Sequence, residues 1–210
     1  MNIKKYISKK GDIVLKELLK IGEIKGLELI GGQITARIEA KDKNNAIGTV
    51  KVIVPKAIKG GKILHEELNE LDYKVELDEK RLTRKGDIVL KMPSPYDAAV
   101  ITEEDEGLLI PSFCIIIRNT DLSMDSDYLA AFFNSNVYLE QVKAMVSGAA
   151  MPMLTIGKIK DVVVRSVALE DQKQIAEYYR NISLKEEILA RVIALEKEKL
   201  DCVLRGERDE

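Results

Sequence analysis

The hydrophobic pattern of the chain changes at about residue 168. Residues 162–167 read Val-Val-Val-Arg-Ser-Val, and this concentration of β-branched residues predicts a strand. Glu170, Asp171 and Gln172 then place acceptor side chains where a helix would begin. Beyond them apolar residues recur with a spacing close to seven, at Ile175, Tyr178 or Tyr179, Ile182, Leu189, Val192, Leu195 and Val203. This spacing predicts a helix from Gln172 to about Arg205.

A helix of about thirty residues is about 45 Å long, which is more than a small domain can cover. An ordinary surface helix folded back on its own domain would leave apolar side chains in water, so the pattern favours pairing with another helix. We therefore expect a domain over residues 1–168 and a long helix with a short tail over residues 169–210. The predicted dimer contacts are Ile175, Ile182, Leu189, Val192 and Leu195.

Shorter patterns of alternating residues precede this helix. Strands are predicted at Leu27–Ile38, Gly48–Pro55, Tyr73–Leu77 and at the end of Arg81–Leu90. Ala98–Ile101 and Leu108–Ile117 are expected to form a hairpin-like pair across an acidic turn, and Ser126 or Asp127 is expected to cap a helix that runs to about Met145. Many short strands with few helices indicate a mixed, strand-rich α+β class.

Charge is distributed unevenly along the chain. The net charge is −2, which by itself argues against a protein that binds a polyanion. Residues 1–62, however, carry 14 Lys and Arg against 6 Asp and Glu, whereas residues 63–210 carry 19 against 29. The basic segment could therefore meet nucleic acid, although any single lysine is by default a solvated surface residue.

Candidate catalytic and metal-binding residues are few. The single histidine, His65, lies beside two glutamates and has no recognisable nucleophile near it in the sequence. Cys114 and Cys202 lie far apart in different predicted elements, so neither a disulfide framework nor a zinc site is supported. The chain has no apolar run of membrane-spanning length and no signal-like apolar core near Met1, and we expect a cytoplasmic protein with no membrane contact.

Four segments in order resemble a known family. These are Lys85-Gly-Asp-Ile-Val-Leu90, Asp127-Tyr-Leu-Ala-Ala-Phe-Phe-Asn-Ser135, Ser147-Gly-Ala-Ala-Met-Pro-Met-Leu154, and the strand, acidic link and Gln-Ile-Ala helix start over residues 162–176. Together they resemble a target-recognition domain in the specificity subunit of type I restriction-modification enzymes. The resemblance covers about residues 45–204. Such a domain implies a non-catalytic chain that recognises a DNA sequence, while a partner methyltransferase carries S-adenosylmethionine.

The resemblance also suggests which residues would meet DNA. In that family the loop after the Gly-Asp-Ile strand lies toward DNA, which makes Lys85, Lys91, Ser94 and Tyr96 candidates. The basic stretch Lys51, Lys56, Lys59 and Lys62 adds a candidate phosphate-facing surface, where Gly60 and Gly61 would allow close backbone approach. The loop Ser147–Thr155 is a further candidate, and its methionines are expected to pack in the core. No cofactor is expected on this chain.

A complete specificity subunit resembles two such units in tandem, whose long helices pack antiparallel. This chain holds one unit, so a homodimer could rebuild a reader of a split, palindromic site. The expected partners are DNA, an adenine methyltransferase subunit and a second copy, with a restriction subunit as a further candidate. The alternative is an assembly or regulatory half-subunit that binds methyltransferase or specificity subunits through its helix without reading DNA.

Overall fold

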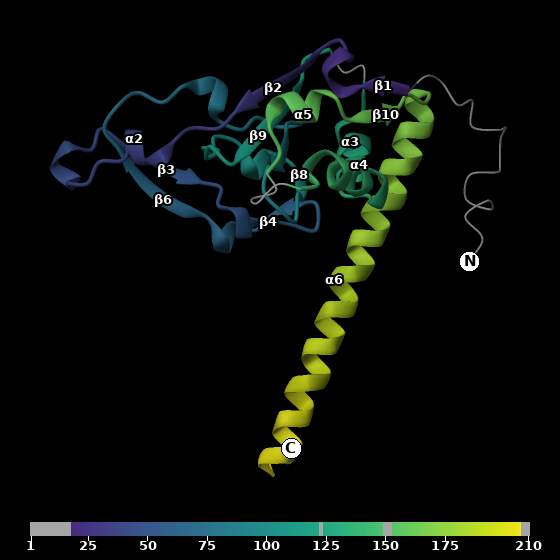
Figure 1. Ribbon diagram of the computed structural model, residues 1–210. Coiled ribbons are helices and arrows are strands. Elements are labelled where there is room, and N and C mark those ends of the chain that lie inside the picture. The colour runs from purple at the N-terminus through teal and green to yellow at the C-terminus, as the bar shows by residue number, and fades with distance from the viewer. Residues whose placement is uncertain (1–17, 122–123, 149–152, 207–210) are drawn as a thin grey trace.

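The centre of the domain is an antiparallel sheet of four strands (Figure 1). Its strands lie in the order β2 (Leu27–Gly31), β9 (Cys114–Asn119), β7 (Ile88–Lys91) and β8 (Ala98–Val100). The computed structural model describes residues 18–121, 124–148 and 153–206. All four residues of β7 are buried, because β7 lies inside the sheet and both faces of the sheet are covered.

Shorter elements surround this sheet. Three antiparallel pairs of strands are formed by β1 (Leu18–Lys20) with β10 (Val163–Arg165), β3 (Gly48–Val52) with β6 (Asn69–Tyr73), and β4 (Ile58–Lys59) with β5 (Lys62–Ile63). The short helices are α2 (Thr35–Ile38) and α5 (Ile156–Lys160). Single 3-10 turns lie at Ile21–Glu23, Lys43–Asn45, Pro55–Ala57, His65–Glu67, Glu79–Arg81 and Glu103–Asp105.

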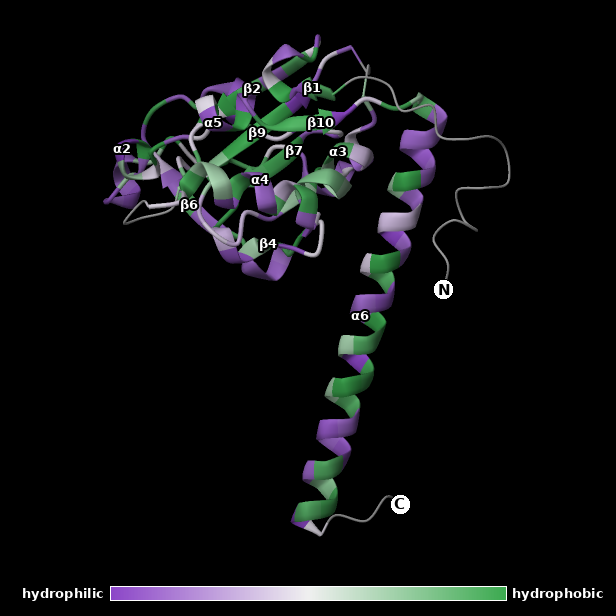
Figure 2. Cartoon of the chain, turned by 45° about the vertical axis from the view of Figure 1, so that its right-hand side comes forward, coloured by the Kyte–Doolittle hydropathy of each residue, from purple (hydrophilic) through white to green (hydrophobic). Residues whose placement is uncertain are grey.

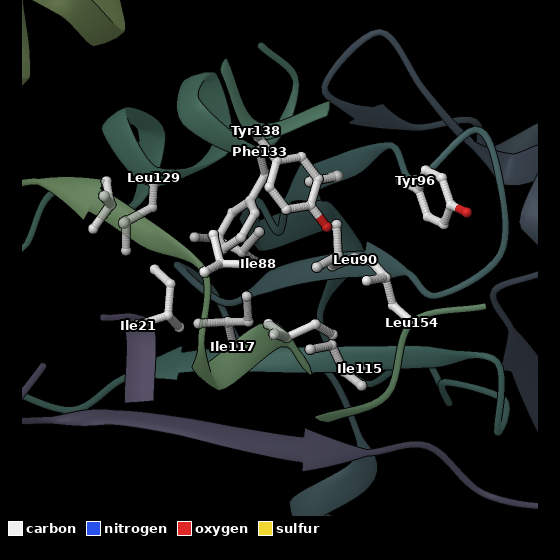
Figure 3. Packing of buried hydrophobic residues seen from close by; sticks show 14 of the residues in the cluster. Ile21, Ile88, Leu90, Tyr96, Ile115, Ile117, Leu129, Phe133, Tyr138 and Leu154 are labelled. Atoms are coloured by element: carbon white, nitrogen blue, oxygen red, sulfur yellow. The ribbon is translucent and has the colours of Figure 1, made fainter. Parts of the chain in front are cut away.

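Hydrophobic residues on the two faces of the sheet form two separate clusters. On one face Ile88, Leu90, Ile115 and Ile117 pack with the aromatic rings of the helical layer (Figure 3). On the other face the alternate residues, such as Val89 and Ile116, pack under the β4–β5 strands. The two-residue period of a strand thus divides one apolar run between two cores.

The helical layer consists of α3 (Ser126–Phe133) and α4 (Asn136–Val146). The sequence predicted one helix over this region, and that prediction is wrong. Asn134 ends α3 and uses its side-chain amide to bond the backbone of Ala98 in β8 at 3.0 Å in both directions. Ser135 then caps α4, accepting from the backbone N–H of Tyr138.

The predicted pairing of Ala98–Ile101 with Leu108–Ile117 is also wrong. β8 pairs with β7, and β9 pairs with β7 on the other side, so that β7 lies between them. The strand expected at Tyr73–Leu77 instead ends at Tyr73 as β6. The strand expected over Leu27–Ile38 ends at Gly31, and Thr35–Ile38 forms the short helix α2 instead.

The last element, α6 (Leu169–Arg205), is one helix of 37 residues that starts against the domain and then leaves it (Figure 1). Gly206 ends it in the left-handed conformation, as is common for a helix C-terminus. Hydrophobic residues continue along the part of α6 that extends beyond the domain (Figure 2). The expected class, a strand-rich α+β domain followed by a long C-terminal helix, is therefore confirmed. No helix among the described residues is both long and apolar enough to cross a membrane.

Candidate nucleic-acid and subunit interfaces

The β4–β5 turn carries the basic surface that the sequence suggested. Ile58 and Ile63 face the core, and Lys59 and Lys62 pair across the two strands and face outward. Gly60 and Gly61 close the turn with φ values of +60° and +79°, a backbone region that favours glycine. The turn therefore presents two ammonium groups and, at Gly60, an exposed backbone position without a Cβ atom.

Carboxylates accompany several of these lysines. Lys56 forms an ion pair with Glu67, and Lys62 forms one with Glu187 of α6 at 2.8 Å. Lys51 lies opposite Glu70 in the β3–β6 ladder. Lys59 has no carboxylate within ion-pair distance in the described part of the chain. These pairs are largely exposed, so competing phosphates could exchange with the carboxylates at modest cost.

The loop after β7 requires a correction to two expected placements. Lys91 is 4% exposed; its Nζ lies 2.6 Å from an Asp97 oxygen and donates to the Ile58 carbonyl at 3.1 Å. Tyr96 is 5% exposed and also points into the protein. Lys91 is the last residue of the buried strand β7, and Tyr96 is buried where the loop returns toward β8, whereas Ser94 between them is exposed.

Lys85 lies on the opposite end of β7 from Ser94. It is exposed and forms an ion pair with Glu103 of the 3-10 turn Glu103–Asp105. The sequence grouped Lys85 with Lys91, Ser94 and Tyr96 because they surround one strand, but the strand separates Lys85 from the other three. Lys85 therefore belongs to a different edge of the domain.

A second candidate loop approaches Ser94. Pro93 forms an isolated bridge with Met153, and the Leu154 N–H donates to the Met92 carbonyl at 2.9 Å. The structure thus brings the start of the loop Met92–Tyr96 beside the end of the loop Ser147–Thr155. The middle of the second loop, residues 149–152, lies outside the described residues. Met153 itself is 44% exposed, so its expected packing in the core is not observed.

The first turns of α6 are anchored by polar contacts that the sequence did not reveal. Gln172 is 2% exposed; its side chain accepts from the Asp125 N–H at 2.7 Å and donates to the Val167 carbonyl at 3.0 Å. Arg180 forms an ion pair with Asp127 of α3 at 2.5 Å. The preceding residue, Tyr179, packs against the β4–β5 turn, where its hydroxyl would lie 3.0 Å from a Cβ on Gly61. The only sequence signal was a glutamine at the start of a helix.

The predicted dimer residues fall into two groups. Ile175 is partly buried and packs against the core of its own domain. Ile182, Leu189, Val192 and Leu195 are 38%, 60%, 47% and 46% exposed, although they are large and apolar. The exposed run continues to the end of the helix with Leu200, Val203 and Leu204. Large apolar side chains exposed in such number on one helix indicate an interaction site.

The histidine forms a hydrogen bond with a buried carboxylate. His65 Nε2 lies 2.6 Å from a carboxylate oxygen of Asp105, which is itself held by Thr102. Burial acts to raise the pKa of Asp105, but hydrogen bonds from Thr102 and His65 outweigh it and hold that pKa below its usual value. Among the described residues, no group of three or more His, Cys, Asp and Glu side chains could hold a metal ion.

No protein-family model matches the sequence, and no curated protein matches it. Several solved structures do match it. A chain from structural work on the assembly and conformational transition of the type I R-M system aligns with a TM-score of 0.61 and 17% identity, over 87% of this chain and 48% of that one. The crystal structure of the HsdS subunit from Thermoanaerobacter tengcongensis aligns with a TM-score of 0.58 and 16% identity, again over 87% and 48%.

The third structure is the type I restriction-modification S subunit from M. genitalium, with a TM-score of 0.53 and 12% identity, over 94% of this chain and 46% of that one. The chain therefore spans about half the length of each of these structures. At these identities the likeness concerns the fold. The chain has the fold of about one half of a type I restriction-modification specificity subunit.

Proposed function

We propose that this chain is a non-catalytic DNA-recognition half-subunit of a type I restriction-modification system. Two copies pair through α6 and together read a bipartite, palindromic DNA site. The dimer directs a partner adenine methyltransferase, and S-adenosylmethionine is bound by that partner. A restriction subunit is a further candidate partner of the same assembly.

One observation carries this proposal: a domain with the fold of a specificity-subunit half is followed by a 37-residue helix whose outer half carries exposed large apolar side chains. Transferring those side chains from water to a helix interface contributes roughly 25 cal/mol per Å² of apolar surface buried. A like helix in antiparallel orientation provides a complementary surface of the same length. Twofold pairing would then place the two domains at opposite ends of a fixed spacer, as a split site requires.

The β4–β5 turn is the best candidate for phosphate contact. Lys56 and Lys62 have side chains that are 65% and 62% exposed, and Lys59 between them is exposed and has no ion-pair partner in the described structure. Their distribution on one edge fits backbone contacts, which position a protein on DNA without reading its sequence. The adjoining loops at Ser94 and Met153 are candidates for base contact.

The proposal is tested by mapping N6-methyladenine across the genome of the source organism, with and without this chain. The expected result is a methylated split palindrome that disappears when the chain is deleted and returns when it is restored. Restoring a chain with Leu189→Asp and Val192→Asp should not return it, because pairing through α6 is needed for a bipartite site. A methylation pattern that does not respond to deletion would contradict the proposal.

A second candidate function is supported by the ion pairs of the basic surface. Lys56 and Lys62 are already matched by Glu67 and Glu187, which favours an assembly or regulatory half-subunit that does not contact DNA. Such a chain would compete with a complete specificity subunit for the methyltransferase. In the same mapping experiment, deletion would then increase methylation at existing sites and would remove no motif.

A further inference from the structure

Lys91 is a buried lysine to which the proposed function gives no role. Its side chain is 5% exposed, and its Nζ forms an ion pair with Asp97 at 2.6 Å. The same Nζ donates to the carbonyl oxygen of Ile58 at 3.1 Å. The backbone N–H of Lys91 donates to the Asp97 carbonyl at 3.0 Å, so the side chain and the backbone both hold that residue. The ammonium group is therefore directed into the protein.

The two partners of this lysine belong to different candidate DNA surfaces. Ile58 is the first residue of β4 and is followed by Lys59 of the exposed basic turn. Asp97 directly follows the loop Met92–Tyr96, which carries the exposed Ser94. One ammonium group thus joins the surface proposed to contact phosphates to the loop proposed to contact bases.

The loop Met92–Tyr96 has a backbone conformation that its neighbours must maintain. Tyr96 has a φ of +62°, in the left-handed region that a bulky side chain rarely adopts. Strained residues of this kind persist only where surrounding contacts hold them, and they cluster at functional sites. The Tyr96 N–H donates to the Pro93 carbonyl at 3.0 Å, and the ion pair with Lys91 holds the next residue, Asp97. The loop is therefore held both from within and from the end of β7.

The β4–β5 turn is likewise held at two points. Lys91, at the end of β7, donates to the carbonyl of Ile58, and the Val100 N–H of β8 donates to the carbonyl of Gly61 at 3.3 Å. Both contacts come from strands of the central sheet. The position of the turn therefore depends on the same strand end that holds the loop.

The Lys91–Asp97 pair fixes geometry more than it stabilises the fold. The attraction within a buried ion pair is largely offset by the lost hydration of the two charges. The Asp97 side chain is 32% exposed, compared with 3% for that of Asp87, so the Asp97 carboxylate keeps contact with water when Lys91 is replaced. Replacing Lys91 should therefore loosen the loop and leave the domain folded.

This inference rests on the proposed DNA-recognition function and deepens it: we propose that Lys91 is a positioning residue for sequence discrimination. Lys91 does not contact DNA. It fixes the loop Met92–Tyr96 relative to the β4–β5 turn, so that the loop reaches base edges when phosphates lie against the turn. Phosphate contacts give affinity for any sequence, and base contacts distinguish sequences. Loss of the fixed arrangement therefore lowers discrimination and retains affinity for random DNA.

Fluorescence anisotropy on the full chain with two duplexes tests this role. One duplex carries the methylated motif found by genome mapping, and the other is a random duplex of the same length. In Lys91→Met the ratio of the two binding constants should fall roughly tenfold or more, the effect of losing one good base contact. Affinity for the random duplex and its salt dependence should not change. An unchanged ratio would overturn the proposal, as would a reduced salt dependence, which would show a direct phosphate contact.

Lys59→Met is the matched control, because it is the same substitution at the exposed lysine beside Ile58. It should weaken binding to both duplexes by the same factor and reduce the salt dependence by about one counterion, with no change in the ratio. An equal loss of discrimination in Lys59→Met and Lys91→Met would overturn the proposal.

A second variant, Asp97→Asn, removes the charge of the partner and keeps the shape of its side chain. It should lower the ratio of the binding constants in the same direction as Lys91→Met. Urea unfolding checks that both proteins fold. If neither variant gave a cooperative transition, the pair would be required for folding, and the proposal would be overturned.

A distance measurement without DNA separates this proposal from the one on which it rests. Spin labels on Lys59→Cys and Ser94→Cys report on the turn and the loop, with Cys202→Ser to remove a native thiol. Burial raises the pKa of Cys114 to about 12, so Cys114 is not labelled at neutral pH. Adding Lys91→Met should broaden the distribution of distances measured by electron paramagnetic resonance.

The two measurements together identify which proposal fails. An unchanged distance distribution in Lys91→Met would overturn the positioning role and leave the DNA-recognition function intact. A broadened distribution in a chain whose parent form binds both duplexes equally would instead overturn the DNA-recognition function, and the positioning of the loop by Lys91 would stand.

Discussion

Asp87 belongs to the Gly-Asp-Ile segment that resembles the specificity-subunit family, and it stabilises the fold of this domain. It is 2% exposed and accepts two hydrogen bonds from Arg118, at 2.9 Å from Nε and 2.7 Å from Nη2. It also accepts from the Arg84 N–H at the turn where Gly86 has a φ of +83°. Arg118 donates further to the Leu82 carbonyl, so the pair ties β7 to β9 and to the segment before β7. The Gly-Asp-Ile sequence therefore has a structural reason, although no sequence pattern indicated that Arg118 was the partner of Asp87.

Removing Arg118 should destabilise the domain strongly. Arg118→Met leaves the Asp87 carboxylate buried without a partner, and breaking such a pair costs about 3–5 kcal/mol. Arg180→Met is the matched control, because its ion pair with Asp127 is exposed and should contribute about 0–1 kcal/mol. Urea unfolding measures both variants. Equal losses would contradict the structural role given to Arg118.

A second prediction concerns the lysines of the β4–β5 turn. Lys56→Glu with Lys59→Glu should weaken binding to all DNA sequences and reduce the salt dependence of the binding constant, since fewer counterions are released. Lys160→Glu is the control, as α5 lies on the other side of the domain from β4 (Figure 1). Binding is measured by fluorescence anisotropy over a series of salt concentrations. If the salt dependence of the binding constant had the same slope for both variants, this surface would be excluded as a DNA contact.

At the scale of elements, sequence patterns predicted those elements whose structure depends on residues close together in the chain. The buried strand β7 and the long helix α6 follow from a β-branched run and from a seven-residue spacing. Which strands pair with each other was not predictable, because β8 and β9 both pair with β7 and not with each other. The break between α3 and α4 was missed for a similar reason. Asn134 ends α3 through bonds to Ala98, which is distant in sequence.

The candidate site was predictable in part for the same physical reasons. Exposed lysines in a glycine turn and exposed apolar residues on a helix are visible as patterns. The burial of Lys91 was not, because it depends on Asp97 across a tight turn and on the Ile58 carbonyl from a distant strand. The anchoring of α6 by Glu187, Tyr179 and Arg180 likewise depends on segments far apart in the sequence.

The prediction at the scale of elements concerns the outer half of α6. Leu189→Asp with Val192→Asp should convert dimers to monomers, because each aspartate would be buried in a helix interface without a partner. Ala190→Asp with Ala194→Asp adds the same charge on the face that carries Glu187, and should leave the dimer intact. Sedimentation velocity distinguishes the two species. A persistent dimer in the first variant would show that α6 is not the interface.

At the scale of the whole molecule, the domain and helix have separate tasks. The domain offers a basic turn and two adjoining loops on its surface, and the helix offers an apolar stripe that leads away from it. His65 is engaged with Asp105. In the proposed function the domain positions the chain on DNA and the helix assembles it. Two copies related by a twofold axis would then double the DNA contacts without any change in the domain.

The solution mass of the purified chain, measured by multi-angle light scattering at several concentrations, tests this account most directly. One copy has a mass of 23.6 kDa. The account predicts a species of twice that mass, which persists on dilution and is lost when Leu189 and Val192 are both replaced by aspartate. A single species of 23.6 kDa at every concentration would contradict the twofold half-subunit.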